Sequence, residues 1–283
     1  MESVGIVGVG LIGGSFGLAL RAAGFEGKIL GVSSDRSTGK AIALNAIDAG
    51  ASLEQAAAEC DLLYLSQPIT AIQTTLEQLG AFDRKGCLIT DAGSTKVEIV
   101  QTAEEHIHRA RFLGGHPMAG KESRGVEAAS AELFQGRPYI LTPRDATTLD
   151  TRAAGGLISW IKRCGANIVT VSPEEHDRSV AFISHLPQMC STALAACLED
   201  REDVDAALRL AGPGLIDMSR LALSSYEIWA DIVATNGENI EHALSVYIDK
   251  ITELRDNLHT QNLGNVFAKA SAIAQRIRQL NNQ

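Results

Sequence analysis

The chain has 283 residues, of which 45% are hydrophobic and 21% are charged, and its formal net charge at pH 7 is -9. This length and composition predict a globular protein of about two domains, each able to bury a hydrophobic core. The acidic balance, without any run of Lys or Arg, disfavours nucleic-acid and anionic-membrane partners. An anionic substrate would therefore need a few specific cations beside its site.

The cysteines and the first residues bear on the compartment. The five cysteines are odd in number and form no C-x-x-C pair, which argues against a disulfide framework and a thiolate zinc site. We expect reduced core residues and no metal site. The chain enters a strand pattern at once, with no basic segment and no apolar run of signal or membrane-helix length. The predicted location is the cytoplasm.

Short apolar runs alternate with helical patterns up to about residue 172. The runs indicate strands, and apolar residues at helical spacing lie between them, as in 11–23 and 95–108. This alternation predicts an α/β domain with a largely parallel sheet covered on both faces. The predicted strands are 4–7, 28–33, 61–66, 87–91, 111–115, 139–142 and 167–171.

The pattern changes at Ser172. The segment 172–175 supplies a helix N-cap, a proline at the first helical position and a capping-box glutamate. Pro187 should kink or break the helix that follows. We predict one domain over 1–172 and an all-helical domain over 173–283, whose long apolar faces favour a two-fold homodimer. The predicted helices are 179–199, 204–210, 217–223, 228–234, 238–259 and 266–280.

A glycine turn, G-x-G-x-x-G at 8–13, follows the first predicted strand. Gly8 permits the tight turn, Gly10 lets the backbone approach a diphosphate, and Gly13 lets the next helix pack against the sheet. The turn lies between a strand and a helix, with a second strand about 20 residues on, which is the context of dinucleotide binding. We predict a Rossmann-type domain; the alternative is a glycine turn that binds nothing.

The end of the second strand bears on the choice between NAD and NADP, because an acid there would bond the ribose of NAD and repel a 2′-phosphate. Register places Ser33 at this position, and Ser33, Ser34 and Arg36 could each contact a phosphate. Asp35 is contrary evidence, and the alternative is an ordinary polar turn. We predict NADP rather than NAD. The predicted cofactor contacts are Gly8, Gly10, Leu11, Ile12, Gly13, Ser33, Ser34, Arg36, and Ser66 and Pro68 at the end of the 61–66 strand.

Two further strand ends, 91–96 and 114–120, carry polar residues. Ligands of parallel sheets bind beyond the carboxyl ends of the strands, so both segments should face the nicotinamide. His116 is held on a stiff turn between Gly-Gly and Pro, where an imidazole could take the proton of a substrate hydroxyl as its carbon loses hydride. The alternative is a loop histidine.

The first helix of the second predicted domain carries further polar residues. His185 and Gln188 interrupt an otherwise apolar pattern, and we predict that they line the cleft. The side chains of His176 and Asp177 could face the same cleft. The alternative is a solvated first turn whose acids suit the helix dipole, which we prefer for the two preceding glutamates.

Taken in chain order, these motifs resemble the prephenate and arogenate dehydrogenases of tyrosine biosynthesis. The resemblance covers nearly the whole chain, and the combination of motifs is highly specific. The matching parts are GVGLIGGS at 8–15, DAGSTK at 91–96, GGHPMAG at 114–120, His176-Asp177, SHLP at 184–187, and Arg220 with Trp229 nine residues on.

The resemblance implies oxidative decarboxylation of a cyclohexadienol. Hydride leaves the carbon that bears the hydroxyl, the ring carboxylate leaves as carbon dioxide, and the ring becomes aromatic. His116 would draw off the hydroxyl proton, Ser94 would orient the same oxygen, and Arg220 would pair with a substrate carboxylate. Trp229 would close the pocket or simply pack. Gln188 stands where some family members have a second histidine.

Lys121 departs from the family, which commonly has Thr after His-Pro-Met-Ala-Gly. Basic Lys121 and neutral Gln188 favour the keto acid prephenate over arogenate, whose ammonium would suit an acidic pocket.

Two rival functions remain. A 3-hydroxyacid dehydrogenase would use a catalytic lysine on the helical domain, and no lysine lies on the helix with His185. The second rival is a protein that binds NADP as a sensor and catalyses no reaction. Such a protein would show no turnover, so replacement of His116 would have no turnover to abolish.

Overall fold

The computed structural model describes residues 1–121 and 123–281. The chain divides into two compact units. Unit 1 comprises Met1–Ser179 and Ser224–Thr235, and unit 2 comprises Val180–Leu223 and Asn236–Gln283. The domain boundary expected after residue 172 stays a prediction.

Unit 1 is built on an eight-stranded sheet with the order β3-β2-β1-β4-β5-β6-β7-β8. All neighbouring strands are parallel except β6 and β7. The chain winds from β1 first to one edge and then to the other, so the carboxyl ends of β1 and β4 flank the switch point where such sheets bind ligands. The strands are β1 (Ser3–Val7), β2 (Lys28–Val32), β3 (Ala49–Gly50), β4 (Leu62–Leu65), β5 (Leu88–Asp91), β6 (Arg111–Pro117), β7 (Pro138–Thr142) and β8 (Asn167–Thr170).

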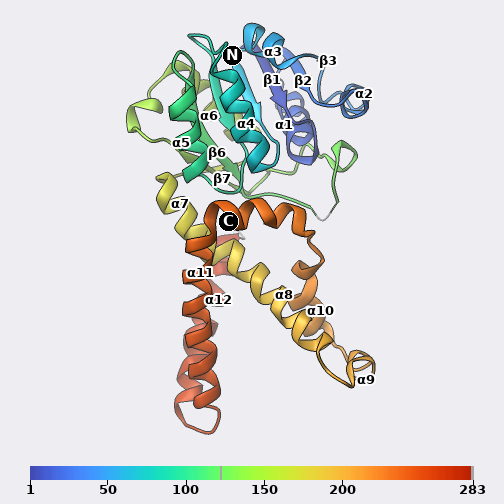
Figure 1. The fold of residues 1–283 in the computed structure, drawn as a ribbon, viewed down its shortest axis with the longest axis vertical. Helices are drawn as coiled ribbons and strands as arrows, with labels where there is room; N and C mark the ends of the chain where they lie inside the picture. The colour runs from blue at the N-terminus through green and yellow to red at the C-terminus, as the bar shows by residue number, and fades with distance from the viewer. Residues whose placement is uncertain (122, 282–283) are drawn as a thin grey trace. The chain divides into compact units, whose positions relative to one another are not determined.

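Helices cover both faces of this sheet (Figure 1). Alternate strand residues share a face, and on one face Tyr64 of β4 stacks on Phe16 of α1 with ring centroids 4.0 Å apart. On the other face, Gly5 of β1 lies beside Ala56 of α3. The helices of unit 1 are α1 (Leu11–Ala22), α2 (Asp35–Ala43), α3 (Leu53–Glu59), α4 (Ile69–Leu79), α5 (Val97–His106), α6 (Arg152–Arg163) and nearly all of α7 (Pro173–Val180).

Unit 2 consists of helices joined by turns, with no strand among its described residues. One helix, α11 (Tyr226–Asp256), begins in unit 1 and continues into unit 2 through Asn236, whose backbone is not helical (φ -138°, ψ 22°). The other elements of unit 2 are a π turn (Ala181–His185), α8 (Leu186–Glu199), α9 (Val204–Leu208), α10 (Pro213–Ser219), a 3-10 turn (Arg220–Leu223) and α12 (Asn262–Asn281).

The fold class predicted from the sequence is confirmed: a mostly parallel Rossmann-type sheet is followed by helices. The N-cap is also confirmed, since the Glu175 N–H donates to Ser172 Oγ at 3.1 Å. The helix expected over 179–199 contains the π turn directly before Pro187, where the sequence predicted a kink or a break. A proline lacks the N–H that would bond the carbonyl four residues earlier, and a π turn changes this pairing locally.

The cysteines agree only in part with the expectation of core residues. Cys60, Cys87 and Cys164 are buried, whereas Cys190 is half-buried and Cys197 is exposed on α8. The expectation is therefore wrong for Cys197, because an apolar helical pattern does not show which face of the helix is covered.

One helical stretch, 173–199, is long and apolar enough to cross a membrane, with a mean hydropathy of 1.3 over its most apolar window. A single stretch of this kind is weak evidence, since the core helix of a globular protein passes the same test. This stretch contains the π turn, and its His176, Asp177 and His185 side chains are buried. Hydrogen-bonded polar groups of this kind fit a helix packed against protein.

Candidate active site

The glycine turn joins β1 to α1, as its pattern predicts. Gly8 has a φ of +91°, and a Cβ at Gly13 would lie 2.3 Å from the carbonyl oxygen of Gly8, so side chains fit at neither position. Gly10 differs, because a Cβ there would meet no described atom within 4 Å. Gly10 also precedes α1 without a side-chain cap. The open space and uncapped amides fit the diphosphate of a dinucleotide.

The next strand end is joined to this turn. Ser66 follows β4, and its hydroxyl donates to the carbonyl oxygen of Gly8 at 2.8 Å. Pro68 precedes the first residue of α4. The structure thus brings Ser66 to the glycine turn, while direct contact of Ser66 or Pro68 with the cofactor stays a prediction.

The residues expected to determine the preference for NADP or NAD lie at the end of β2 and the start of α2. Ser33 directly follows β2, and Ser34 is the N-cap of α2, where its Oγ accepts the Ser37 N–H at 3.4 Å. Arg36 is exposed in the first turn of this helix. Their contacts with a 2′-phosphate stay predictions.

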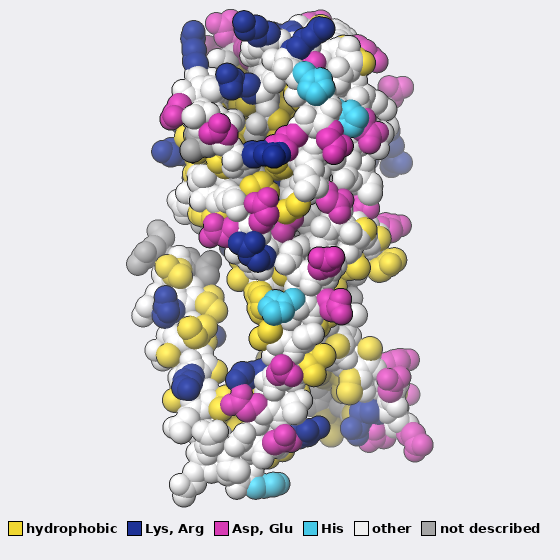
Figure 2. Space-filling model, turned by 60° about the vertical axis from the view of Figure 1, so that its left-hand side comes forward, with side chains coloured by type: hydrophobic (Ala, Val, Ile, Leu, Met, Phe, Trp, Pro, Cys, Tyr) yellow, Lys and Arg dark blue, Asp and Glu magenta, His cyan; other side chains and the backbone are white. Residues whose placement is uncertain are grey.

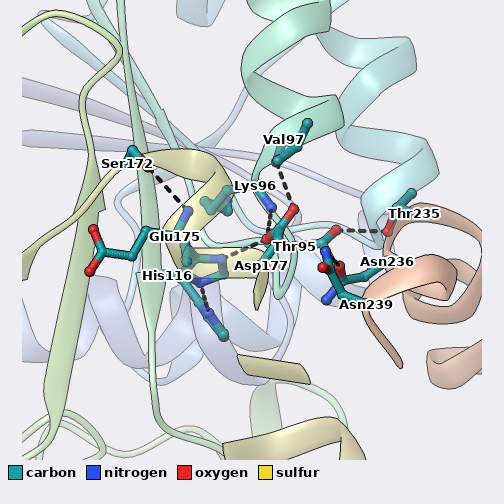
Figure 3. Close-up of polar contacts among 12 residues, drawn as sticks. Thr95, Lys96, Val97, His116, Ser172, Glu175, Asp177, Thr235, Asn236 and Asn239 are labelled. Carbon is teal, nitrogen blue, oxygen red and sulfur yellow. Dashed lines mark hydrogen bonds and ion pairs between the residues drawn. The ribbon is translucent and has the colours of Figure 1, made fainter. Parts of the chain in front are cut away.

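His116 lies in β6 and is hydrogen-bonded to a second histidine (Figure 3). The Nδ1 atom of His116 is 2.8 Å from Nε2 of His176, and Nδ1 of His176 is 2.7 Å from Oδ1 of Asp177. His176 and Asp177 are each only 1% exposed. The alternative of a solvated first turn is therefore wrong for His176 and Asp177, although Glu174 and Glu175 are exposed as expected.

Burial determines the charge of the middle histidine. It lowers the pKa of His176, and the hydrogen bond from His176 to Asp177 opposes that effect only in part. His176 is therefore neutral at pH 7, with its proton on the nitrogen that faces the carboxylate. Its Nε2 is then an acceptor, so His116 donates through Nδ1.

Asp177 also binds the backbone of a distant loop. Its Oδ1 accepts the Lys96 N–H at 2.8 Å, and its Oδ2 accepts the Val97 N–H at 2.9 Å (Figure 3). These amides belong to the N-cap and first residue of α5, so a carboxylate on α7 caps another helix. Ser94 is half-buried in the same loop, two residues before Lys96.

A buried ion pair joins the ends of β5 and β6. The Lys96 ammonium pairs with the Asp91 carboxylate, and neither side chain is exposed. Lys96 Nζ also donates to the carbonyl oxygen of Gly115 at 2.9 Å, while Asp91 accepts the Gly93 and Gly115 N–H groups. Burial lowers the pKa of Lys96, against the effect of Asp91. The pair therefore holds the residue next to His116.

Two predicted substrate residues lie elsewhere in unit 1. Lys121 is exposed, and its ammonium donates to the carbonyl oxygen of Ala128 at 2.9 Å. Trp229 is half-buried on α11, and its indole N–H donates to Ser224 Oγ at 3.1 Å. Their contacts with substrate stay predictions.

The other predicted substrate residues belong to unit 2. His185 ends the π turn, is 1% exposed, and has its Nδ1 3.3 Å from Nδ2 of Asn236. Gln188 donates to the carbonyl oxygen of Leu221 at 2.8 Å. Because Leu221 follows Arg220 in the 3-10 turn, Gln188 helps to hold the turn that begins with this arginine.

Comparison with known proteins gives consistent matches. Residues 16–170 match the family model described as "Prephenate dehydrogenase, nucleotide-binding domain", and residues 172–270 match "Prephenate dehydrogenase, dimerization domain". Prephenate dehydrogenase of Bacillus subtilis is 34% identical over 271 residues, which are 94% of this chain and 72% of that protein.

Solved structures agree with these matches. The structure of prephenate dehydrogenase from A. aeolicus with hydroxyphenyl propionate and NAD+ has a TM-score of 0.89 and 31% identity, and the match covers 98% of each chain. Synechocystis arogenate dehydrogenase has a TM-score of 0.83 and 30% identity, over 97% of this chain and 99% of that one.

Proposed function

This chain belongs to the prephenate dehydrogenase family, and on that premise we propose that His116 is its catalytic base. The protein is an NAD(P)-dependent oxidoreductase of tyrosine biosynthesis. It oxidatively decarboxylates prephenate to 4-hydroxyphenylpyruvate or arogenate to tyrosine. The residue roles, the preferred substrate and the preferred cofactor are the proposed parts.

A bound dinucleotide would supply the hydride acceptor for the ring carbon that carries the hydroxyl. His116 takes the hydroxyl proton on Nε2 as that C–O bond becomes a carbonyl. Cleavage of the bond between ring and carboxylate releases carbon dioxide and leaves its electron pair in the ring, which becomes aromatic. The new phenolate oxygen then takes up one proton. Ser94 orients this oxygen, and Arg220 pairs with a substrate carboxylate.

The hydrogen bond between His116 Nδ1 and His176 Nε2 is the observation that carries this proposal. A histidine that donates through Nδ1 is in the tautomer whose basic nitrogen is Nε2. Replacement of His116 by Asn should abolish turnover while cofactor affinity is retained. His108→Asn is the matched control, since His108 is an exposed histidine of the same unit. Undiminished turnover in His116→Asn would end the proposal.

Prephenate is the proposed substrate and NADP the proposed cofactor. Neutral Gln188 and basic Lys121 favour a keto acid over the ammonium of arogenate. Ser33 stands where an acid would repel the 2′-phosphate of NADP. Steady-state kcat/KM for the four pairings of prephenate or arogenate with NAD+ or NADP+ tests both choices. Absence of turnover in all four pairings would refute the enzyme assignment itself.

We also propose that the protein is a cytoplasmic homodimer. Large hydrophobic side chains are exposed on the helices of unit 2 (Figure 2). Ile248 on α11 and Phe267 and Ile273 on α12 are each more than half exposed. Such apolar area is typical of a surface that a second subunit covers. Light scattering should show a dimer, and Phe267→Glu should favour the monomer; a monomeric native protein would contradict the proposal.

A further inference from the structure

We propose that Asp177 is a positioning residue that sets two parts of the active site at once: His116, through His176, and the Ser94 loop, through the cap on α5. This inference rests on the proposed role of His116 as base. Asp177 itself is placed in contact with His176 and with the backbone of Lys96 and Val97, and it need not touch substrate.

The first step of the argument concerns the tautomer of His116. An ionised Asp177 only accepts hydrogen bonds, so the proton of neutral His176 lies on Nδ1, which faces the carboxylate at 2.7 Å. His176 must then accept at Nε2, and His116 must carry its own proton on Nδ1. A neutral amide at position 177 could donate instead. That reversal would pass along the chain and leave Nε2 of His116 protonated, in the wrong form for a base.

The second step concerns charge. When His116 takes the substrate proton it becomes an imidazolium, and a carboxylate at the end of the chain stabilises that cation through His176. The charged groups that affect His176 are Asp177 and Asp91, which favour its cation, and Lys96, which disfavours it. Since His176 and Asp177 are buried, water screens this interaction weakly.

The third step concerns the Ser94 loop. The same carboxylate accepts the first two amides at the start of α5, directly after the loop that carries Ser94. Lys96 also ties this loop to Gly115, which precedes His116. A shift of the Asp177 side chain would therefore move the histidine and the serine together. The two groups assigned to one substrate oxygen are thus held by one carboxylate.

Three variants test the inference: Asp177→Asn, His176→Gln and His176→Leu. Asp177→Asn should lower kcat/KM by about 10²–10⁴-fold, as loss of tautomer control does in related catalytic chains. His176→Gln keeps an acceptor for His116 Nδ1 and should be about tenfold more active than His176→Leu. Glu175→Gln, an exposed carboxylate whose side chain points away from Asp177 (Figure 3), is the control and should match the parent enzyme.

The pH profile separates positioning from mere structural support. In His176→Gln the acid limb of kcat/KM should move to lower pH, because the Asp177 charge no longer favours protonated His116. Cofactor affinity, measured by fluorescence titration, should be unchanged in every variant. An Asp177→Asn enzyme within threefold of the parent, an unmoved acid limb, or equal rates for His176→Gln and His176→Leu would each overturn the inference. Should Asp177→Asn fail to fold, the two His176 variants decide.

The His116→Asn variant distinguishes the two levels of the argument. If it retains turnover, the assignment of the base fails. If it is inactive while the Asp177 and His176 variants keep parental rates and profiles, the base assignment stands and only the positioning role fails.

Discussion

Lys96→Met should destabilise unit 1 far more than the loss of a lysine usually does. The ammonium and its Asp91 partner are completely buried, and removal of one partner from such a pair costs about 3–5 kcal/mol. Asp91 would still accept the Gly93 and Gly115 N–H groups, at 2.8 and 3.0 Å. We therefore expect the lower end of that range, about 3 kcal/mol, which a domain of ordinary stability survives.

Urea unfolding followed by tryptophan fluorescence measures this loss. The two tryptophans, Trp160 and Trp229, both belong to unit 1, so the signal reports on the unit that contains the ion pair. Lys85→Met is the matched control, because Lys85 is exposed in the same unit. A loss below about 1 kcal/mol in Lys96→Met, or a loss equal to that of Lys85→Met, would refute the reasoning.

Four further predictions follow from particular contacts. Gly13→Ala should cost about 1–3 kcal/mol of unfolding free energy because its Cβ would overlap a carbonyl oxygen, whereas Gly10→Ala should keep the parental Tm and lose cofactor affinity in a titration. Ser33→Asp should lower kcat/KM for NADP+ relative to NAD+; an unchanged ratio would contradict the assigned position. Arg220→Lys should raise KM for the substrate more than it lowers kcat, because a lysine cannot bind a carboxylate through two parallel bonds. Burial alone would raise the pKa of Asp83, but the three N–H groups of residues 108–110 that it accepts lower it overall. This stabilisation is present above the unfolded-state pKa and is lost as pH falls through the lower folded pKa. Asp83→Asn should therefore lower the free energy of unfolding by about 2 kcal/mol at pH 7, but by little below about pH 3.

Much of the fold could be predicted because its signals are local. Buried parallel strands are short apolar runs, and the glycine turn and Ser172 cap have fixed spacings. The exceptions lacked such a signal. The two residues of β3 are too few to show any period. By contrast, the two helices predicted at 228–234 and 238–259 correspond to the two parts of α11, which meet at Asn236, whose backbone is not helical.

Candidate site residues could be named from the sequence, but the hydrogen bonds that join them could not. The motifs pointed to His116 and Ser94, and they included His176 and Asp177 without a decision between cleft and solvent. No local pattern shows that Asp177 caps a helix about 80 positions earlier in the chain. Likewise, the run from Asp91 to Lys96 was interpreted as a polar strand end, although its two charged ends are buried against each other.

The composition of unit 1 has a consequence for truncation and domain exchange. The segment Ser224–Thr235 belongs to this unit although it lies far along the chain. Thr235 Oγ1 is 2.8 Å from Thr95 Oγ1, and Asp231 accepts the Thr70 N–H and hydroxyl. A fragment that ends at residue 172 lacks both contacts, one of them directly beside Ser94. A chimera that exchanges nucleotide-binding domains between relatives should therefore transfer two separate stretches of sequence together.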